Sequence, residues 1–321
     1  MTGESYAGVL VPTTALLLLE ARDANFKDAE NAPAPYNLKG IALGNACPGN
    51  RIFTCTPYSG WIGAQVAVDF RYGHGMISPQ TYELLQEACK EDWNKYGPPD
   101  NATCREIIGE DPARPVMDEA GDTYQMGGGY FLYDHCGSDL LSVDPQTGMA
   151  RQNEGRMDGV SLFDDNKGES TTSVYKCGQE RAALQWIRLA EVQDAIHVER
   201  KPEFSFVTSL NYTFTKYSLL DDYRDTLSQK IRIMQYSGDA DPCVPYVGTR
   251  RWIDELGLPV KSSWKPWTVS GQVAGYRTVY QGGVNNTFTF TTIRNAGHMV
   301  PRHQPRQALH MIKSFLAGED L

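Results

Sequence analysis

The sequence Gly3-Glu4-Ser5-Tyr6-Ala7-Gly8 stands directly before an apolar run at residues 9–19. A serine between small residues and ahead of an apolar helix is typical of a sharp strand-to-helix turn, where the hydroxyl projects at the helix N-terminus. Small neighbours tolerate the strained backbone of such a turn, and Ala7 occupies the place where the general pattern has glycine. We therefore expect Ser5 to be a catalytic nucleophile. A helix cap is the simpler alternative, because serine is also a favoured N-cap residue.

Composition predicts a folded globular protein. The 321-residue chain is 41% hydrophobic, which is enough for the core of one large domain or two small ones. Its net charge of -9 is scattered and argues against a nucleic-acid surface, which would show clustered Lys and Arg. The longest apolar stretch, at residues 9–19, contains Pro12 and is too short to span a membrane. We therefore expect neither nucleic-acid binding nor a membrane span.

Cysteines and sequons favour the secretory pathway, either a vacuole or lysosome or the extracellular space. Seven cysteines occur beside three Asn-x-Thr sequons at Asn101, Asn211 and Asn285, where we expect N-linked glycans. The N-terminus nevertheless lacks the basic lead and cleavage site of a signal peptide. This conflict predicts that the natural N-terminus is absent from the chain.

Hydrophobic patterns predict alternating helices and strands on both sides of an irregular middle. Buried strands are predicted at residues 38–45, 231–236 and 287–294, and a hairpin at residues 265–281. Helices are predicted at residues 10–22, 80–89, 191–198, 219–229, 247–256 and 304–316. Such alternation is typical of a parallel sheet with crossover helices.

The middle of the chain, from Cys47 to about Tyr175, is predicted to be an insertion of helical pieces that covers one end of the sheet. One helix has a clear start, because Ser78 is a good cap and Pro79 suits the first helical position. The polar residues 141–173 are expected to form a long exposed loop that is open to proteolytic nicking.

Two predicted strands end in polar residues of catalytic type. Asp239 and Asp241 follow the strand at residues 231–236, and His298 follows the strand at residues 287–294. Carboxyl ends of parallel strands meet at one edge of a sheet, so these side chains can converge. With Ser5 they give the order Ser, Asp, His that is expected of α/β-hydrolases. Taken singly, an Asp after a strand more often forms a turn or a cap.

Ordered blocks along nearly the whole chain resemble the serine carboxypeptidase family. They are Gly3-Glu4-Ser5-Tyr6-Ala7-Gly8 with Val11-Pro12, Lys39-Gly40 to Gly44-Asn45, Tyr72-Gly73-His74-Gly75-Met76-Ile77-Ser78, Glu191 to Val198, Ser237-Gly238-Asp239-Ala240-Asp241 with Val244-Pro245 and Thr249-Arg250, Gly271 to Gly275, and Ala296-Gly297-His298-Met299-Val300-Pro301 with Gln304-Pro305 to Leu309. The resemblance implies an α/β-hydrolase fold with an incomplete central mixed sheet and a mostly helical insertion subdomain. It divides the chain into core elements at residues 1–46, an insertion at 47–185, and the remaining core with the Asp and His loops at 186–321.

The same resemblance assigns roles to single residues. It implies that Ser5 is the nucleophile, His298 the base, and Asp241 the residue that orients the base, with Asp239 left to shape the turn. The backbone N–H of Tyr6 would donate to the oxyanion.

The substrate pocket is also implied by the resemblance. Glu4 would help to grip the C-terminal carboxylate of a peptide, and Met299 and Cys243 would border the site. Two carboxyls that face each other must share a proton, so binding should be best in acid.

Disulfides implied by the resemblance join Cys89 to Cys104 and Cys136 to Cys177. A pair between Cys47 and Cys55 is a further prediction, which leaves Cys243 as a thiol in the pocket wall. No pair of histidines has zinc-site spacing, so no metal is expected, and no cofactor is predicted.

The family carries about 150 residues ahead of the nucleophile, which is the size of a typical domain. We therefore expect this chain to lack the strand beneath Ser5, the Gly-rich block with the second oxyanion donor, and an Asn of the carboxylate pocket. The predicted function is a carboxypeptidase that removes C-terminal residues from peptides through an acyl-enzyme. Two alternatives stay open: a catalytically silent homologue that acts as a binding module, and an acyltransferase on the same scaffold. Formation of a homodimer is also left open.

Overall fold

The structure is a computed structural model that describes residues 1–25, 37–49, 61–93, 97–110, 115–120, 129–133, 141–143, 150–152, 186–201, 213, 216 and 218–321. Internal contacts divide the chain into two compact units. The first comprises Met1–Thr123, Gly129–Leu132 and Phe214–Leu321, and the second comprises Tyr124–Gly128 and Tyr133–Thr213. The predicted boundaries at residues 46 and 185 stay a prediction.

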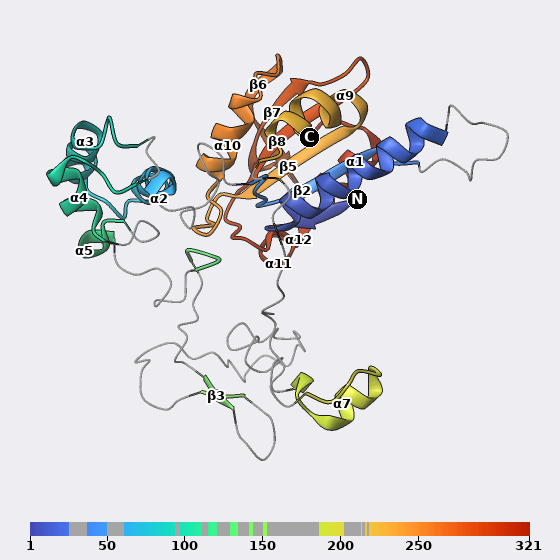
Figure 1. Cartoon of the computed structure of the whole chain (residues 1–321), viewed down its shortest axis with the longest axis horizontal. Helices are drawn as coiled ribbons and strands as arrows, with labels where there is room; N and C mark the ends of the chain where they lie inside the picture. Colours follow the sequence, from blue (N-terminus) through green and yellow to red (C-terminus); the bar gives the residue numbers. More distant parts are fainter. Residues whose placement is uncertain are drawn as a thin grey trace. The chain divides into compact units, whose positions relative to one another are not determined.

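A six-stranded mixed sheet forms the centre of the first unit, with strand order β1-β2-β5-β8-β7-β6 (Figure 1). The strands β1 (Thr2–Glu4), β2 (Gly40–Gly44), β5 (Arg232–Gly238) and β8 (Thr287–Ile293) pair in parallel. The strands β6 (Val260–Val269) and β7 (Gln272–Gln281) form an antiparallel hairpin, and β7 pairs antiparallel with β8. The predicted strands and hairpin are thus confirmed.

The expectation that the strand beneath Ser5 is absent is wrong. Thr2–Glu4 forms β1, whose residues Thr2 and Glu4 lie opposite Ala42 and Gly44 of β2. The ladder continues past its end, because the N–H of Ser5 donates to the carbonyl of Gly44 at 3.0 Å. Three residues can form a strand here because β2 supplies their hydrogen-bond partners. A segment this short carries no detectable alternation of polar and apolar residues, so the sequence could not predict it.

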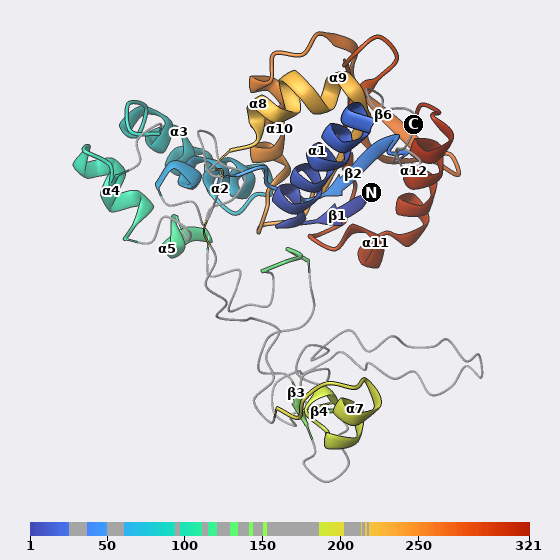
Figure 2. The ribbon, with the colours of Figure 1, turned by 45° about the vertical axis from the view of Figure 1, so that its right-hand side comes forward.

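Two hydrophobic clusters form the core, one on each face of the sheet. Ile41 and Leu43 of β2 belong to the first cluster, whereas Ala42 between them belongs to the second. This separation follows from the alternation of side chains along a strand. The first cluster packs α1 (Ala7–Asn25), residues 219–231 and α10 (Tyr246–Glu255) against the sheet, and the second packs α12 (Pro305–Ala317). Figures 1 and 2 both show α1 beside β1 and β2.

The predicted helices are also observed. The segment predicted at residues 219–229 consists of α8 (Leu220–Asp222), a π-helical turn (Tyr223–Leu227) and α9 (Ser228–Lys230). The helix predicted at residues 80–89 is α3 (Pro79–Ala88), and the Ser78 hydroxyl caps it by accepting from the N–H of Thr81 at 3.2 Å. The short helix α11 (Val300–His303), directly after His298, was not predicted.

Helices α2 (Trp61–Gly73), α3, α4 (Ala102–Ile108) and α5 (Met117–Ala120) come from the predicted insertion and contribute residues to a third hydrophobic cluster. A disulfide between Cys89 and Cys104 joins the end of α3 to α4. Arg251 of α10 bonds to Asp69 of α2.

The second unit holds α7 (Ala190–Ala195) and a two-stranded antiparallel hairpin of β3 (Leu141–Val143) and β4 (Ala150–Gln152). The hairpin corrects the prediction of a continuous loop at residues 141–173, since its two strands pair with each other. The rest of that predicted loop lies outside the described residues.

Candidate active site

Four parallel strands end at the same edge of the sheet, and the predicted triad residues follow three of them. Glu4, Gly44 and Tyr236 lie in register across β1, β2 and β5, which aligns the strand ends. Ser5 follows β1 directly, Asp241 follows β5, and His298 follows β8. The topology therefore brings these segments to the carboxyl edge, where sites in α/β sheets usually lie.

Ser5 occupies a strained and crowded turn. Its backbone φ is 60°, in the left-handed region that non-glycine residues seldom adopt. A Cβ on Gly3 would lie 2.5 Å from the Cβ of Ala7, and a Cβ on Gly8 would lie 2.5 Å from the carbonyl oxygen of Cys47. Side-chain atoms close to Gly3 and backbone atoms close to Gly8 thus explain the small residues on both sides of Ser5. A strained strand-to-helix turn of this kind is typical of a nucleophile elbow.

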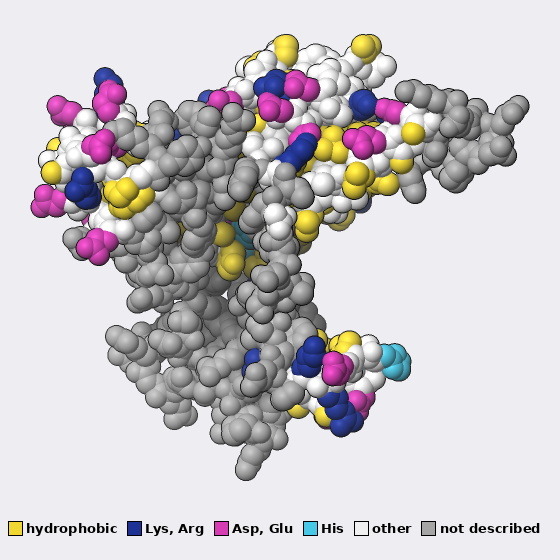
Figure 3. Space-filling view, in the orientation of Figure 1, with side chains coloured by type: hydrophobic (Ala, Val, Ile, Leu, Met, Phe, Trp, Pro, Cys, Tyr) yellow, Lys and Arg dark blue, Asp and Glu magenta, His cyan; other side chains and the backbone are white. Residues whose placement is uncertain are grey.

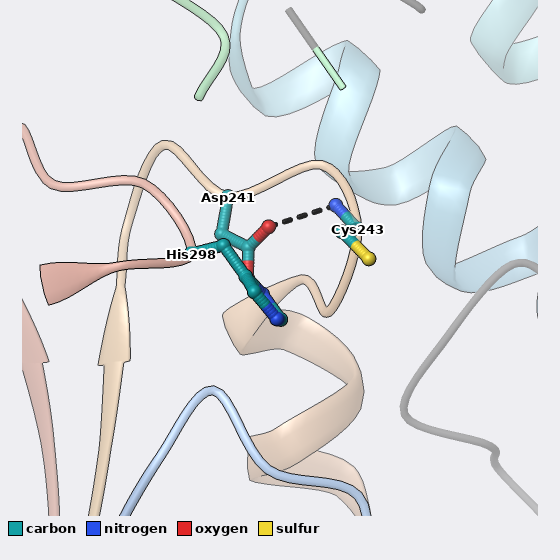
Figure 4. A group of neighbouring side chains, drawn as sticks. All are labelled: Asp241, Cys243 and His298. Atoms are coloured by element: carbon teal, nitrogen blue, oxygen red, sulfur yellow. Dashed lines mark hydrogen bonds and ion pairs between the residues drawn. The ribbon is translucent and has the colours of Figure 1, made fainter. Parts of the chain in front are cut away.

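His298 and Asp241 form a buried pair. His298 Nδ1 lies 2.7 Å from Asp241 Oδ2, and the residues are 4% and 0% exposed (Figure 4). Burial alone would lower the pKa of His298, but the hydrogen bond and negative charge of Asp241 outweigh it and raise the pKa above its usual value. A hydrogen bond at Nδ1 leaves Nε2 as the second ring nitrogen available for proton transfer.

The Asp241 carboxylate accepts hydrogen bonds on both oxygens. Oδ2 accepts from Asn45 Nδ2 at 2.6 Å as well as from His298, and Oδ1 accepts from the N–H of Cys243 at 2.8 Å. Ligand atoms of Asp241, Cys243 and His298 lie within 4.8 Å of one another, a set that could hold a metal ion. The hydrogen bonds on both carboxylate oxygens favour an orienting role for Asp241 instead.

Asp239, the other candidate, takes part in the turn. Its Oδ1 accepts from the N–H of Asn295 at 2.7 Å, which ties the loop after β5 to the loop after β8. Burial raises the pKa of this carboxyl. These contacts fit the turn-forming role that was expected for Asp239.

Glu4 lies within electrostatic reach of the buried pair. Burial raises the pKa of Glu4, the positive form of His298 lowers it, and Asp241 raises it; the net pKa is higher than usual. Of the other predicted pocket residues, Cys243 is buried and lies beside Asp241, and Met299 directly precedes α11. Tyr6 is exposed at the start of α1.

Two further residues contact the pair and were missed by sequence reasoning. Asn45 is the donor to Asp241, and its place at the end of the predicted strand at residues 38–45, in a block that resembles the family, carried no indication of this contact. The Tyr130 ring lies 5.1 Å from the His298 ring, and the Tyr130 carbonyl accepts from the N–H of His298 at 2.6 Å. Tyr130 comes from the predicted insertion, far from His298 in sequence, so no local pattern could have indicated this contact.

Some of the other predicted positions lie among the described residues and some lie outside them. Cys47 is disulfide-bonded, whereas Cys55, Cys136, Cys177 and the sequon Asn211 lie outside the described residues. Asn101 caps α4 and Asn285 lies in the turn between β7 and β8; both are exposed, as N-glycosylation requires. Glycosylation and a secretory location stay predictions. In the described part of the chain, no helix is long and apolar enough to cross a membrane.

The mixed sheet, its flanking helices and the edge that carries Ser5, Asp241 and His298 define an α/β-hydrolase fold. The family model described as serine carboxypeptidase matches residues 1–318, and the chain therefore belongs to the serine carboxypeptidase family.

Relatives and a solved structure cover the whole chain. Putative serine carboxypeptidase-like 30 of Arabidopsis thaliana is 28% identical over 327 residues, which are 100% of this chain and 60% of that relative. Serine carboxypeptidase 1 of Hordeum vulgare is 26% identical over 337 residues, 100% of this chain and 63% of that relative. A prohormone-processing carboxypeptidase from Saccharomyces cerevisiae has a similar fold, with 16% identity and a TM-score of 0.55 over 99% of this chain and 61% of that one. The chain thus spans less than two thirds of these proteins.

Proposed function

We propose that this chain carries the catalytic residues of a serine carboxypeptidase that releases C-terminal residues from peptides. The buried Asp241–His298 pair supports this function most directly, because it lies at the same sheet edge as the strained turn of Ser5. A nucleophile, a base and a carboxylate that orients the base are the parts that acyl transfer requires.

The proposed reaction proceeds in two steps. Ser5 Oγ attacks the carbonyl carbon of the last peptide bond while His298 Nε2 takes its proton, and the Tyr6 N–H stabilises the oxyanion. The C–N bond then breaks, and His298 returns the proton to the leaving amine. Water next attacks the acyl-enzyme with His298 as the base, which releases the shortened peptide and restores the Ser5 hydroxyl.

Glu4 is proposed to recognise the C-terminal carboxylate of the substrate. A protonated carboxyl can donate a hydrogen bond to a carboxylate, and the raised pKa of Glu4 keeps that form present at higher pH than for an ordinary glutamate. Binding should weaken as the pH rises through this pKa.

The rate of proton transfer should instead increase as the pH rises, because His298 must be neutral to act as a base and its pKa is raised. We therefore expect KM to be lowest in acid and kcat to increase toward neutral pH.

Hydrolysis of an N-blocked dipeptide with a free C-terminus tests the proposal. The assay covers the range from about pH 5 to about pH 8, because protonated Glu4 should favour binding toward the acid end and the neutral form of His298 becomes more abundant toward the alkaline end. Ser5→Ala is expected to abolish release of the terminal amino acid. Ser270→Ala is the matched control, because Ser270 also has a positive φ, of 52°, but lies exposed in the β6–β7 turn. Undiminished activity of S5A would refute the nucleophile assignment.

A further inference from the structure

Asn45 connects the ends of β2 and β5 through one buried side chain. It follows β2 directly, is 0% exposed, and lies 196 residues before Asp241 in sequence. Its Nδ2 donates to Asp241 Oδ2 at 2.6 Å, and its Oδ1 accepts from the N–H of Gly238, the last residue of β5, at 3.2 Å. The amide therefore satisfies a backbone donor and the buried carboxylate at once.

The backbone at Asn45 is adapted to hold this side chain in place. Its φ is 41°, in the left-handed region, and its N–H donates to the carbonyl of Tyr236 at 2.8 Å. Glycine would adopt this φ without strain, and asparagine is among the few other residues that tolerate it. Glycine, however, would leave both Asp241 and Gly238 without their amide partner. The side chain, rather than the turn, thus explains why an asparagine suits this position.

We propose that Asn45 is a positioning residue of the triad, which holds the Asp241 carboxylate in the orientation that directs its Oδ2 to His298 Nδ1. The inference rests on the proposed function of Asp241 and His298. Oδ2 has two donors, so Asn45 limits rotation of the carboxylate about its last bond. The Asn45 amide also interacts with the negative charge of Asp241, which would otherwise act on His298 alone.

Two variants separate the two hydrogen bonds of the amide. Asn45→Asp keeps an acceptor for the Gly238 N–H and tolerates a positive φ, but it replaces the donor with a carboxyl. Asn45→Gly keeps the backbone conformation and removes both bonds. Matched controls are Asn295→Asp and Asn295→Gly, because Asn295 also has a positive φ, of 55°, in the loop after β8, and it is exposed.

The first readout is the pH dependence of turnover. N45G should lose about tenfold to a hundredfold in kcat, with little change in KM, because a hydrogen bond to a charged group is lost. N45D should approach wild-type kcat in acid, where its protonated carboxyl can donate to Asp241. Its kcat should fall relative to wild type as the pH rises and the donor is lost. A merely structural role would give the same loss at every pH.

The second readout does not need activity. The titration of His298 can be followed by NMR through its ring C–H signal, which is assigned by its absence in His298→Gln. Loss of the Asn45 donor should raise the pKa of His298, because the Asp241 charge then acts more strongly on the imidazolium. N45D should raise it further, since a second carboxylate adds negative charge. The Asn295 variants should leave it unchanged.

These readouts distinguish failure of the inference from failure of the proposed function. A wild-type chain without turnover, in which N45G still raises the His298 pKa, would contradict the function but support the positioning role. An N45G variant with wild-type kcat and an unchanged His298 pKa would overturn the inference. If N45G does not fold, N45D decides the matter, because an unchanged His298 titration in that variant is equally incompatible with the proposal.

Discussion

Positive φ angles recur where the sheet meets the site. Ser5, Asn45 and Asn295 follow β1, β2 and β8, with φ values of 60°, 41° and 55°. Each such residue costs about 1–3 kcal/mol, which surrounding contacts must offset. The N–H groups of all three are held by hydrogen bonds, to Gly44, Tyr236 and Asp239. At each of these residues the chain turns sharply after a strand. The turns keep the side chains of the candidate site close to the carboxyl edge of the sheet.

Sequence could predict the residues that we propose to react or to orient the base, but not the residues that hold them. Ser5, Asp241 and His298 are recognisable because each follows a predicted strand or precedes a predicted helix in the expected order. Asn45 also ends a predicted strand, but neither it nor Tyr130 is of a residue type expected in the triad, and both act through contacts with residues far away along the chain. A buried hydrogen bond of this kind depends on the pairing of whole strands.

Exchange of Asp241 tests the orienting role at the residue scale. Asp241→Asn should lower kcat by about a thousandfold to ten-thousandfold, because an amide cannot stabilise the imidazolium and favours the wrong tautomer of His298. KM should change little. Asp239→Asn is the matched control, because it keeps the Oδ1 that accepts from the N–H of Asn295 and should lose less than tenfold. Steady-state kinetics of both variants would decide, and equal losses would remove the distinction between the two aspartates.

At the scale of elements, prediction succeeded where a segment spans several periods. The helices α1, α10 and α12 and the strands β2, β5 and β8 each have enough residues to show their apolar pattern. It failed for β1 and α11, with three and four residues, because neither completes enough turns or alternations. The hairpin of β3 and β4 was missed for the same reason. Neighbours, rather than local propensity, stabilise these short elements.

The contact of the Ser5 turn with the segment after β2 can be tested through Gly8. A Cβ on Gly8 would lie 2.5 Å and 2.6 Å from the backbone O and N of Cys47, and backbone atoms cannot move aside as a flexible side chain could. Gly8→Ala should therefore lower the free energy of unfolding by about 1–3 kcal/mol. It should also lower kcat, because Ser5 and Asn45 would be pushed apart.

Gly73→Ala, at the end of α2, is the control for this measurement. A Cβ there has no heavy atom within 4 Å, so its free energy of unfolding should stay the same or increase by up to ~1 kcal/mol. Urea unfolding followed by circular dichroism measures both variants. Equal stability of G8A and G73A would show that the turn is not packed as tightly as the structure indicates.

At the scale of the whole molecule, the two edges of the sheet differ. The edge strand β6 contains Lys261, Lys265 and Pro266 and has irregular register with β7, features that discourage pairing with another chain. Among the residues that the structure describes, β1 has no strand on its outer side, and it contains no lysine or proline. Beside it, α1 exposes Leu10 and Leu17, which are 57% and 62% exposed. Figure 3 shows hydrophobic side chains along this helix.

This asymmetry predicts that copies of the chain associate through β1 and α1. An open strand edge offers backbone hydrogen bonds, and the exposed leucines beside it would be removed from water on association, which is favourable. Leu10→Glu combined with Leu17→Glu should therefore shift the protein toward the monomer in sedimentation velocity across a series of concentrations. Leu309→Glu combined with Leu316→Glu is the matched control, because these leucines of α12 are 53% and 70% exposed but belong to the helix that packs on the other face of the sheet from α1. An equal shift toward the monomer with both pairs of substitutions would mean that the added negative charge, and not the loss of a contact at β1 and α1, reduces association. A wild-type chain that is monomeric at every concentration would contradict association at this edge.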